Sequence, residues 1–181
     1  PELKKAGSKL IWIKTPKAEY DLPDYEKLMA VYEKFSEAVH TGKVLSAYVL
    51  DRHGVVPAVS KMAFGNSMGV KLSDEIPAGQ LFAPACTDIV AEVEADKIDE
   101  LGFEYVEIGE VTAEPNFVYG NTVITIKEAV DAWKETLERV FKTVSGEETG
   151  SAVPEVGEEK SSDGKLGEDG LFRASKVYVC E

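Results

Sequence analysis

The sequence predicts an α+β fold in which a mixed β-sheet is layered with α-helices. The first indication is the order of elements suggested by hydrophobic periodicity: strand, helix, strand, helix, several strands and a final helix. The second is the composition, because 44% hydrophobic residues can bury a sizeable core and exclude wholesale disorder. The third is the length of 181 residues, which suits one ordinary domain and is too short for two large ones.

Strands and helices alternate in the first part of the chain. Pro16 ends the first β-former run, and Asp24 can cap the helix that follows. Gly42 is a stop signal for this helix, and Pro57 is tolerated in the first turn of the next one, where its missing N–H does little harm. We therefore expect strands at residues 9–14, 44–50 and 70–72, and helices at residues 24–41 and 55–64.

The following part of the chain is richer in strands. Glu92 and Glu94 alternate with apolar residues, so we expect both carboxylates on the solvent face of one strand. Gly109 can form a β-bulge, and Gly120-Asn121 can form a short hairpin turn. We expect a loop at residues 74–84, strands at 88–95, 103–111, 117–119 and 122–126, a helical turn at 96–101, and a helix at 126–143. The last helix is expected to bury an apolar stripe made of Ala129, Ala132, Trp133, Leu137, Val140 and Phe141.

Acidic residues dominate the charge. Asp and Glu total 33 against 20 Lys and Arg, and the net charge of -13 weighs against a nucleic-acid or anionic-membrane partner. No apolar run is long enough to span a bilayer, and Cys86 and Cys180 cannot form a disulfide framework. We therefore expect a cytoplasmic protein that binds neither nucleic acid nor membrane.

The composition changes near residue 146. The last 36 residues hold nine acids, four bases and six of the 15 glycines. Between residues 146 and 170, apolar side chains are too few to offset the entropy of ordering the chain. The chain begins with Pro1 rather than Met, which suggests a piece of a longer protein. We expect a folded domain at residues 1–145, an acidic glycine-rich linker at 146–170, and the start of a following domain at 171–181.

The residue chemistry by itself identifies no catalytic or metal site. His40 lies late in a helix and is most simply a surface side chain, whereas His53 occupies a strand-to-helix turn. Cys86 lies in a loop without a CxxC motif and without a histidine nearby in sequence. The turn from Gly65 to Gly69 either admits a ligand close to the backbone or simply ends a helix. No G-x-G-x-x-G or G-x-x-x-x-G-K phosphate motif is present.

Three stretches together resemble a known family. Residues 42–66 resemble the strand–turn–helix of the C-terminal half-domain in the aminoimidazole ribonucleotide synthetase superfamily, which usually reads G-x-V-x-S-A-H-D-V-S-D-G-G-L and then A-L-x-E-M. Residues 108–112, Ile-Gly-Glu-Val-Thr, resemble its late I-G-x-V strand. The last helix contains W-x-x-x-L-E-x-V-F before a linker. This helix narrows the resemblance to the large single-chain phosphoribosylformylglycinamidine synthases.

The resemblance covers residues 8–145 and makes residues 1–145 a synthetase C-terminal-like half-domain. It implies a sheet between helix layers, partly ferredoxin-like. It also implies an ATP- and glutamine-dependent amidation of formylglycinamide ribonucleotide in de novo purine biosynthesis. ATP and Mg would act in the full-length enzyme. The partners would be the remaining synthetase domains and a glutaminase domain of the same chain, which would begin at residues 171–181.

This sequence departs from the family pattern at the turn that carries nucleotide chemistry. Tyr48-Val49 stand where the family has His-Asp, and residues 51–55 read Asp-Arg-His-Gly-Val where it has S-D-G-G-L. Lys142 stands where proline is usual. The half-domain therefore resembles a degenerate partner that contributes walls and packing instead of catalytic groups.

Part of the nucleotide-site character is kept. Nucleotide- or substrate-binding residues carried over by the resemblance are Ser46, Asp51, Gly54, Gly65 and Asn66. No catalytic residue and no metal ligand is carried over, and we expect the isolated fragment to be inactive. The alternatives are another enzyme of the superfamily, such as a selenophosphate synthetase or thiamine-phosphate kinase relative, and a non-catalytic scaffolding or nucleotide-binding half-domain.

Overall fold

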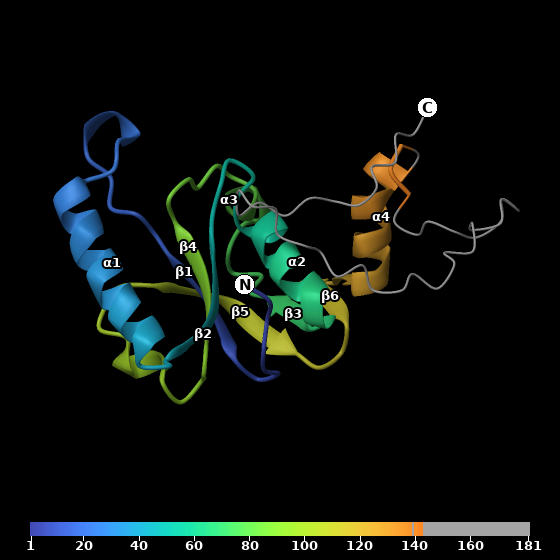
Figure 1. Ribbon diagram of the computed structural model, residues 1–181, viewed down its shortest axis with the longest axis horizontal. Helices are drawn as coiled ribbons and strands as arrows, with labels where there is room; N and C mark the ends of the chain where they lie inside the picture. The colour runs from blue at the N-terminus through green and yellow to red at the C-terminus, as the bar shows by residue number, and fades with distance from the viewer. Residues whose placement is uncertain (139, 143–181) are drawn as a thin grey trace, which may run out of the picture. The chain divides into compact units, whose positions relative to one another are not determined.

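The structure is a computed structural model, in which residues 1–138 and 140–142 are described (Figure 1). The linker expected at residues 146–170 and the domain start expected at residues 171–181 lie outside the described residues. The described part confirms the α+β class, because it contains four α-helices and one mixed sheet of seven strands. No helix within it is long and apolar enough to cross a bilayer.

The strands are β1 (Lys9–Ile13), β2 (Val44–Val49), β3 (Gly69–Leu72), β4 (Ile89–Val93), β5 (Val106–Thr112), β6 (Asn116–Tyr119) and β7 (Thr122–Thr125). Their order across the sheet is β2-β4-β1-β5-β3-β6-β7, so β5 is the central strand. Neighbouring strands pair antiparallel except β3 and β6, which pair parallel. The mixed character that the sequence predicts therefore comes from a single parallel pair in the described sheet.

The β-bulge expected at Gly109 is confirmed. Leu10 pairs with Gly109 whereas Ile11 pairs with Glu107, so the register between β1 and β5 shifts by one residue. The position also needs glycine for space, because a Cβ there would lie 2.2 Å from the carbonyl oxygen of Lys71 in β3. The absent side chain thus allows the two neighbouring strands to approach.

Local sequence signals explain where the helices begin and end. The helices are α1 (Tyr25–His40), α2 (Val55–Asn66), α3 (Ala78–Leu81) and α4 (Ile126–Glu138), with 3-10 turns at Glu19–Asp21 and Ile98–Glu100. The carboxylate of Asp24 caps α1 by accepting from the N–H of Lys27. Thr125 and Glu128 form a reciprocal capping box at the start of α4. The expectation of a plain loop at residues 74–84 was wrong, because Pro77 precedes the one-turn helix α3.

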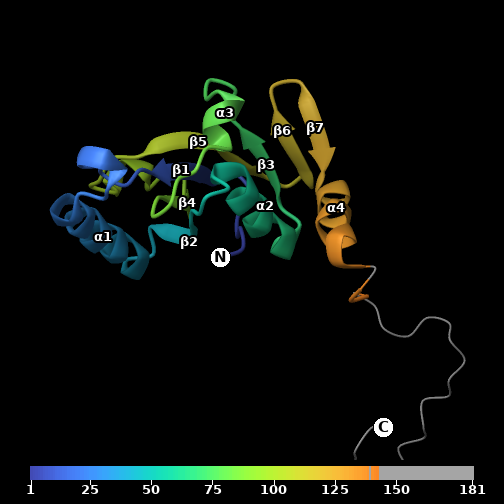
Figure 2. The ribbon, with the colours of Figure 1, turned by 90° about the horizontal axis from the view of Figure 1, so that it is seen from above.

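Helices cover both faces of the β2-β4-β1 part of the sheet (Figure 2). Leu10 and Trp12 of β1 belong to the core that also contains the buried side of α2. Ile11 and Ile13 belong to a second core, to which α1 contributes Ala38. Because consecutive residues of a strand point to opposite faces, the apolar run of β1 supplies two cores at once.

The apolar stripe expected on the last helix is not buried. Ile126 is buried and Val130 packs against the core, but Trp133 is 60% exposed, and Leu137, Val140 and Phe141 are exposed as well. The first half of α4 therefore contacts the domain, whereas its second half presents apolar side chains to solvent. The physical reason is that helical periodicity marks a face but does not specify a partner for it.

Candidate functional site

The turn that the family resemblance singles out joins β2 to α2. Asp51 lies in this turn, and its Oδ1 accepts a hydrogen bond from the backbone N–H of His53 at 2.7 Å. The Nδ1 atom of His53 lies 3.1 Å from the same oxygen. The backbone N–H of His53 is the main cause that lowers the pKa of Asp51 below its ordinary value. Both side chains remain half exposed, so the turn presents an Asp–His pair to solvent.

Gly54 is required by the packing of this turn. Its φ of 80° lies in the left-handed region, and a Cβ there would lie 2.6 Å from the carbonyl oxygen of Ala83. The backbone N–H of Ala85 also donates to the carbonyl of Asp51 at 3.2 Å. The turn is therefore held directly against the backbone of the segment that follows α3.

Ser46 is buried and engaged within the protein. Its hydroxyl donates to Oε2 of Glu92 at 2.8 Å. The two carboxylate oxygens of Glu92 also accept from the backbone N–H groups of Lys4 and Lys5 and from the hydroxyl of Ser8. The expectation that Glu92 lies on a solvent face was wrong, because the chain before β1 folds over that position.

Gly65 and Asn66, at the end of α2, contact the same N-terminal segment. A Cβ on Gly65 would lie 2.3 Å from Cγ of Glu2, and the side-chain amide of Asn66 donates to the carbonyl of Leu3 at 2.7 Å. The N–H of Leu3 donates to the carbonyl of Met62 at 2.9 Å. In this structure both residues therefore hold the start of the chain against α2.

The structure separates the five candidate residues into two groups. Asp51 and Gly54 form the first group and lie just before α2. Gly65 and Asn66, at the end of α2, form the second group because they contact the N-terminal segment. Ser46 belongs to this second group because it binds Glu92, which also binds the N-terminal segment. The 12 residues of α2 span about 18 Å. Sequence reasoning missed Glu92 as the centre of the second group. The available signal was its place as the one charged residue in the strand Ile89–Val93.

The turn offers a single carboxylate, Asp51, as a possible ligand of a magnesium–nucleotide complex. Among the described residues, no group of three or more His, Cys, Asp and Glu side chains could hold a metal ion. Asp51 is the carboxylate of the turn, and its Oδ1 is already engaged with His53.

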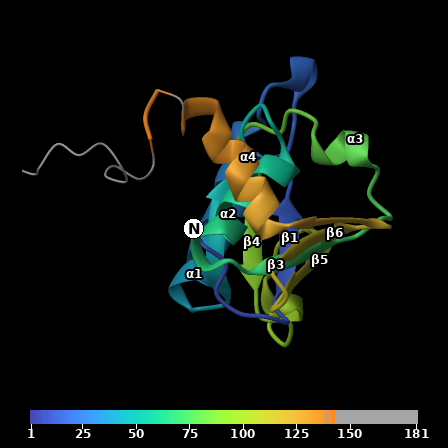
Figure 3. The ribbon, with the colours of Figure 1, turned by 90° about the vertical axis from the view of Figure 1, so that its right-hand side faces the viewer.

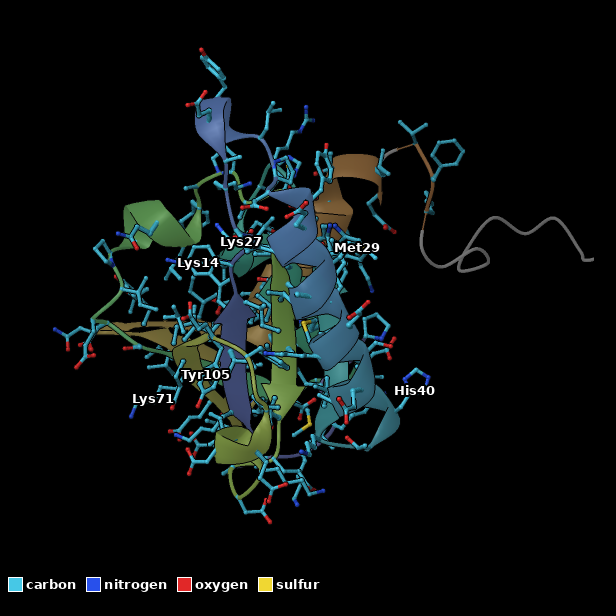
Figure 4. The ribbon with its side chains drawn as sticks, turned by 90° about the vertical axis from the view of Figure 1, so that its left-hand side faces the viewer. Lys14, Lys27, Met29, His40, Lys71 and Tyr105 are labelled. Atoms are coloured by element: carbon cyan, nitrogen blue, oxygen red, sulfur yellow. The ribbon has the colours of Figure 1, made fainter. Side chains whose placement is uncertain are left out.

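Other reactive side chains do not join the turn. His40 lies at the end of α1, exposed to solvent, on the side of the helix that also carries Met29 (Figure 4). Its Nδ1 atom lies 2.7 Å from the carbonyl of Ser36, one turn earlier. Cys86 is exposed and not in a disulfide. The exposure of His40 agrees with the surface side chain expected from the sequence.

No protein-family model matches the chain. Among solved structures, it is similar to Thermotoga maritima PurL in complex with AMPPCP, with a TM-score of 0.57 at 17% identity. It is also similar to phosphoribosylformylglycinamidine synthase II of Thermotoga maritima, with a TM-score of 0.56 at 16% identity, and to PurLQS of the same organism, with a TM-score of 0.57 at 17% identity. Each match covers 70% of this chain and 26% of the other, so the chain spans about a quarter of the length of these proteins. At this level of identity the likeness shows a shared fold.

Proposed function

We propose that this chain is part of a phosphoribosylformylglycinamidine synthase and supplies a C-terminal synthetase half-domain. The observation that carries the proposal is that the motif of residues 42–66 coincides with β2, the turn and α2 in a fold shared with Thermotoga maritima PurL. The resemblance of the motif and the shared fold are the two observations that support the proposal.

The activity we propose belongs to the whole enzyme. Glutamine is hydrolysed in a glutaminase domain, and the ammonia released travels to the synthetase. ATP, with Mg, phosphorylates the amide oxygen of formylglycinamide ribonucleotide, and ammonia then displaces phosphate. In this scheme residues 1–145 form the half-domain, residues 146–170 are the linker, and residues 171–181 begin the glutaminase domain of a cytoplasmic enzyme.

Within that enzyme, we assign this half-domain a supporting role. Strand β2 ends in Tyr48-Val49 where the family has His-Asp, and Asp51 is the one carboxylate of the turn that follows. Asp51 and Gly54 remain the residues that would face a nucleotide or substrate. The other three candidates would not face the ligand. They would influence its binding only by packing the N-terminal segment against α2, and they are Ser46, Gly65 and Asn66.

The experiment is a reconstitution with phosphate release as its readout. We expect the full chain alone to release no phosphate from ATP. Mixed with a polypeptide that carries the remaining synthetase domains, it should support release that requires both formylglycinamide ribonucleotide and ammonia. Turnover by the chain alone would contradict the supporting role. Phosphate release with selenide, or formation of ADP without phosphate release with thiamine phosphate, together with no release with formylglycinamide ribonucleotide, would assign the chain to another enzyme of the superfamily.

A second candidate is a non-catalytic scaffolding or nucleotide-binding half-domain of another member of the superfamily. The observation that favours it is that β2 ends in Tyr48-Val49 where the family has His-Asp. Calorimetry of the full chain with ATP and Mg separates the possibilities. Tight binding of ATP would exclude a purely structural role, whereas no heat of binding would agree with one.

A further inference from the structure

The N-terminal segment, residues 2–6, precedes β1 and lies beside α2 (Figure 3). It contains no helix and no strand. Leu3 anchors it, because this side chain is fully buried in the same core as Met62 of α2. The N–H of Leu3 donates to the carbonyl of Met62 at 2.9 Å, and the side-chain amide of Asn66 donates to the carbonyl of Leu3 at 2.7 Å. The first attachment point of the segment is therefore the C-terminal half of α2.

The second attachment point is a single buried carboxylate. Both oxygens of Glu92 accept from the N–H of Lys4, at 3.1 and 2.9 Å, and Oε1 also accepts from the N–H of Lys5 at 2.9 Å. The hydroxyl of Ser8, just after the segment, lies 2.7 Å from Oε1. From β2, the hydroxyl of Ser46 donates to Oε2 at 2.8 Å. Glu92 thus holds the backbone of the segment and connects it to β2.

A glycine separates the segment from the sheet. Gly7 has a φ of 84°, in the left-handed region, and open space around the position of a Cβ. Its N–H donates to the carbonyl of Val111 in β5 at 2.8 Å, and the N–H of Val111 donates to the carbonyl of Ser8 at 2.9 Å. Gly7 and Ser8 are therefore fixed to β5, whereas residues 2–6 have no strand partner. This arrangement makes Gly7 the natural hinge of the segment.

We propose that the N-terminal segment is a strap that opens and closes as one unit, held at two points by Asn66 and Glu92. Asn66 holds the carbonyl of Leu3, whereas Glu92 holds the N–H groups of Lys4 and Lys5. Because these peptide groups are consecutive in the chain, release at one point frees the backbone at the other. A ligand or partner chain that draws the Asn66 amide away from Leu3 would therefore also release the segment from Glu92. The inference goes beyond the synthase assignment and does not depend on it.

The experiment is amide hydrogen exchange of the full chain, read for single residues by NMR at constant pH. An opening smaller than global unfolding gives its amides a lower protection factor than the core of the domain has. The reference is Val90, which is buried in β4 between β1 and β2. In the wild type we expect the amides of Leu3 and Lys5 to share one protection factor, about tenfold or more below that of Val90.

Two variants each weaken one attachment point, and their effect is read at the other. Glu92→Gln should lower the protection of the Leu3 amide about tenfold, although that N–H is bonded to Met62 and not to Glu92. Asn66→Ala should lower the protection of the Lys5 amide by a similar factor, although that N–H is bonded to Glu92. Such an effect at the unaltered point requires that the two points open together.

The control is Glu94→Gln, which removes the exposed ion pair of the Lys5 side chain and leaves the Lys5 N–H on Glu92, so both protection factors should stay unchanged. The proposal is overturned if each variant affects only its own attachment point or if neither has an effect. Protection as high as that of Val90, or an equal loss in the control, would also overturn it. Circular dichroism establishes whether Glu92→Gln folds, and if it does not, the Lys5 amide in Asn66→Ala decides the result.

Discussion

Glu92 is the residue with the most unusual environment in the described structure. Its side chain is fully buried in β4, and in the described part of the chain no lysine or arginine side chain forms an ion pair with it. Two backbone N–H groups and two hydroxyls satisfy its oxygens instead, from Lys4, Lys5, Ser8 and Ser46. A buried carboxylate is stable only with such compensation, so this network ties the N-terminal segment to two strands.

We predict that Glu92→Gln destabilises the protein by about 2 kcal/mol. The amide nitrogen cannot accept, so buried donors lose a partner while the volume of the side chain is kept. The measurement is urea unfolding followed by circular dichroism. The control is Glu107→Gln, which removes the exposed ion pair with Lys9 and should cost under about 1 kcal/mol. Equal and small losses in both variants would show that the Glu92 network contributes little.

Glu94 predicts a pH dependence. Hydrogen bonds from Lys97 and then Lys5 lower its pKa from 4.5 to about 2. Because the folded pKa is depressed, the stabilisation is present above pH 4.5 and is lost as the pH falls toward 2. We expect the difference in Tm between the wild type and Glu94→Gln to shrink across that window in thermal melts. A difference in Tm that stays constant across that window would contradict the prediction.

The contrast between Glu92 and Glu94 shows what alternation can predict. The sequence predicts one face for both residues, but β4 ends at Val93, and Glu94 follows it and binds Lys5 and Lys97 at the surface. Glu92 could not be placed from alternation, because its environment is created by residues more than 80 positions earlier in the chain. A pattern of period two specifies the face of a side chain but not what later covers that face.

At the scale of elements, the junction between the β2–α2 turn and the segment after α3 depends on Gly54. We predict that Gly54→Ala costs about 3 kcal/mol or more, since left-handed strain and a close backbone contact add. Substitutions at two other glycines, Gly102 and Gly79, serve as controls that separate the two causes. Gly102 has a φ of 71° and open space around a Cβ, so Gly102→Ala should cost about 1 kcal/mol. Gly79 in α3 has neither feature, so Gly79→Ala should not destabilise.

Chemical denaturation of the three variants gives this ranking directly. If Gly54→Ala and Gly102→Ala cost the same, the close contact with the carbonyl of Ala83 does not matter for stability. In that case the left-handed backbone conformation would be the remaining reason for a glycine in this turn.

Elements with their own local signals were predictable. The cap at Asp24, the bulge at Gly109 and the hairpin turn at Gly120-Asn121 were all expected from single residues or pairs, and the structure confirms them. The short helix α3 was not expected, because one turn after a proline carries no periodicity. The sequence also predicted the apolar stripe of the last helix. Its burial was not predictable, because burial depends on what packs against the stripe.

At the scale of the whole molecule, Trp133 tests the extent of the packed domain. A buried tryptophan would cost roughly 3–5 kcal/mol on truncation to alanine. Because Trp133 is 60% exposed and contacts the ring of Phe64, we predict a loss of about 1 kcal/mol. Met62→Ala, at a fully buried position of α2, should cost about 2–5 kcal/mol in the same urea melts. A loss at Trp133 as large as that at Met62 would mean that this face of α4 is covered in solution.

The candidate site was only partly predictable. The resemblance led to the turn at residues 51–54, which the structure shows as a well-packed junction. It could not reveal that Ser46, Gly65 and Asn66 contact or connect to the first residues of the chain. Those contacts join segments that are distant in sequence, and a motif records only residues that are close along the chain.

The strand order has a consequence for how the domain folds. Of the neighbouring strand pairs in the described sheet, only β6 and β7 are consecutive in the chain. Every other pair requires closure of a long loop before any pairing energy is gained, and such topologies fold slowly, in about milliseconds to seconds. We therefore expect stopped-flow refolding of the chain on this timescale, with the β6–β7 hairpin free to form early. A main refolding phase in microseconds would show that the distant pairings do not limit the rate.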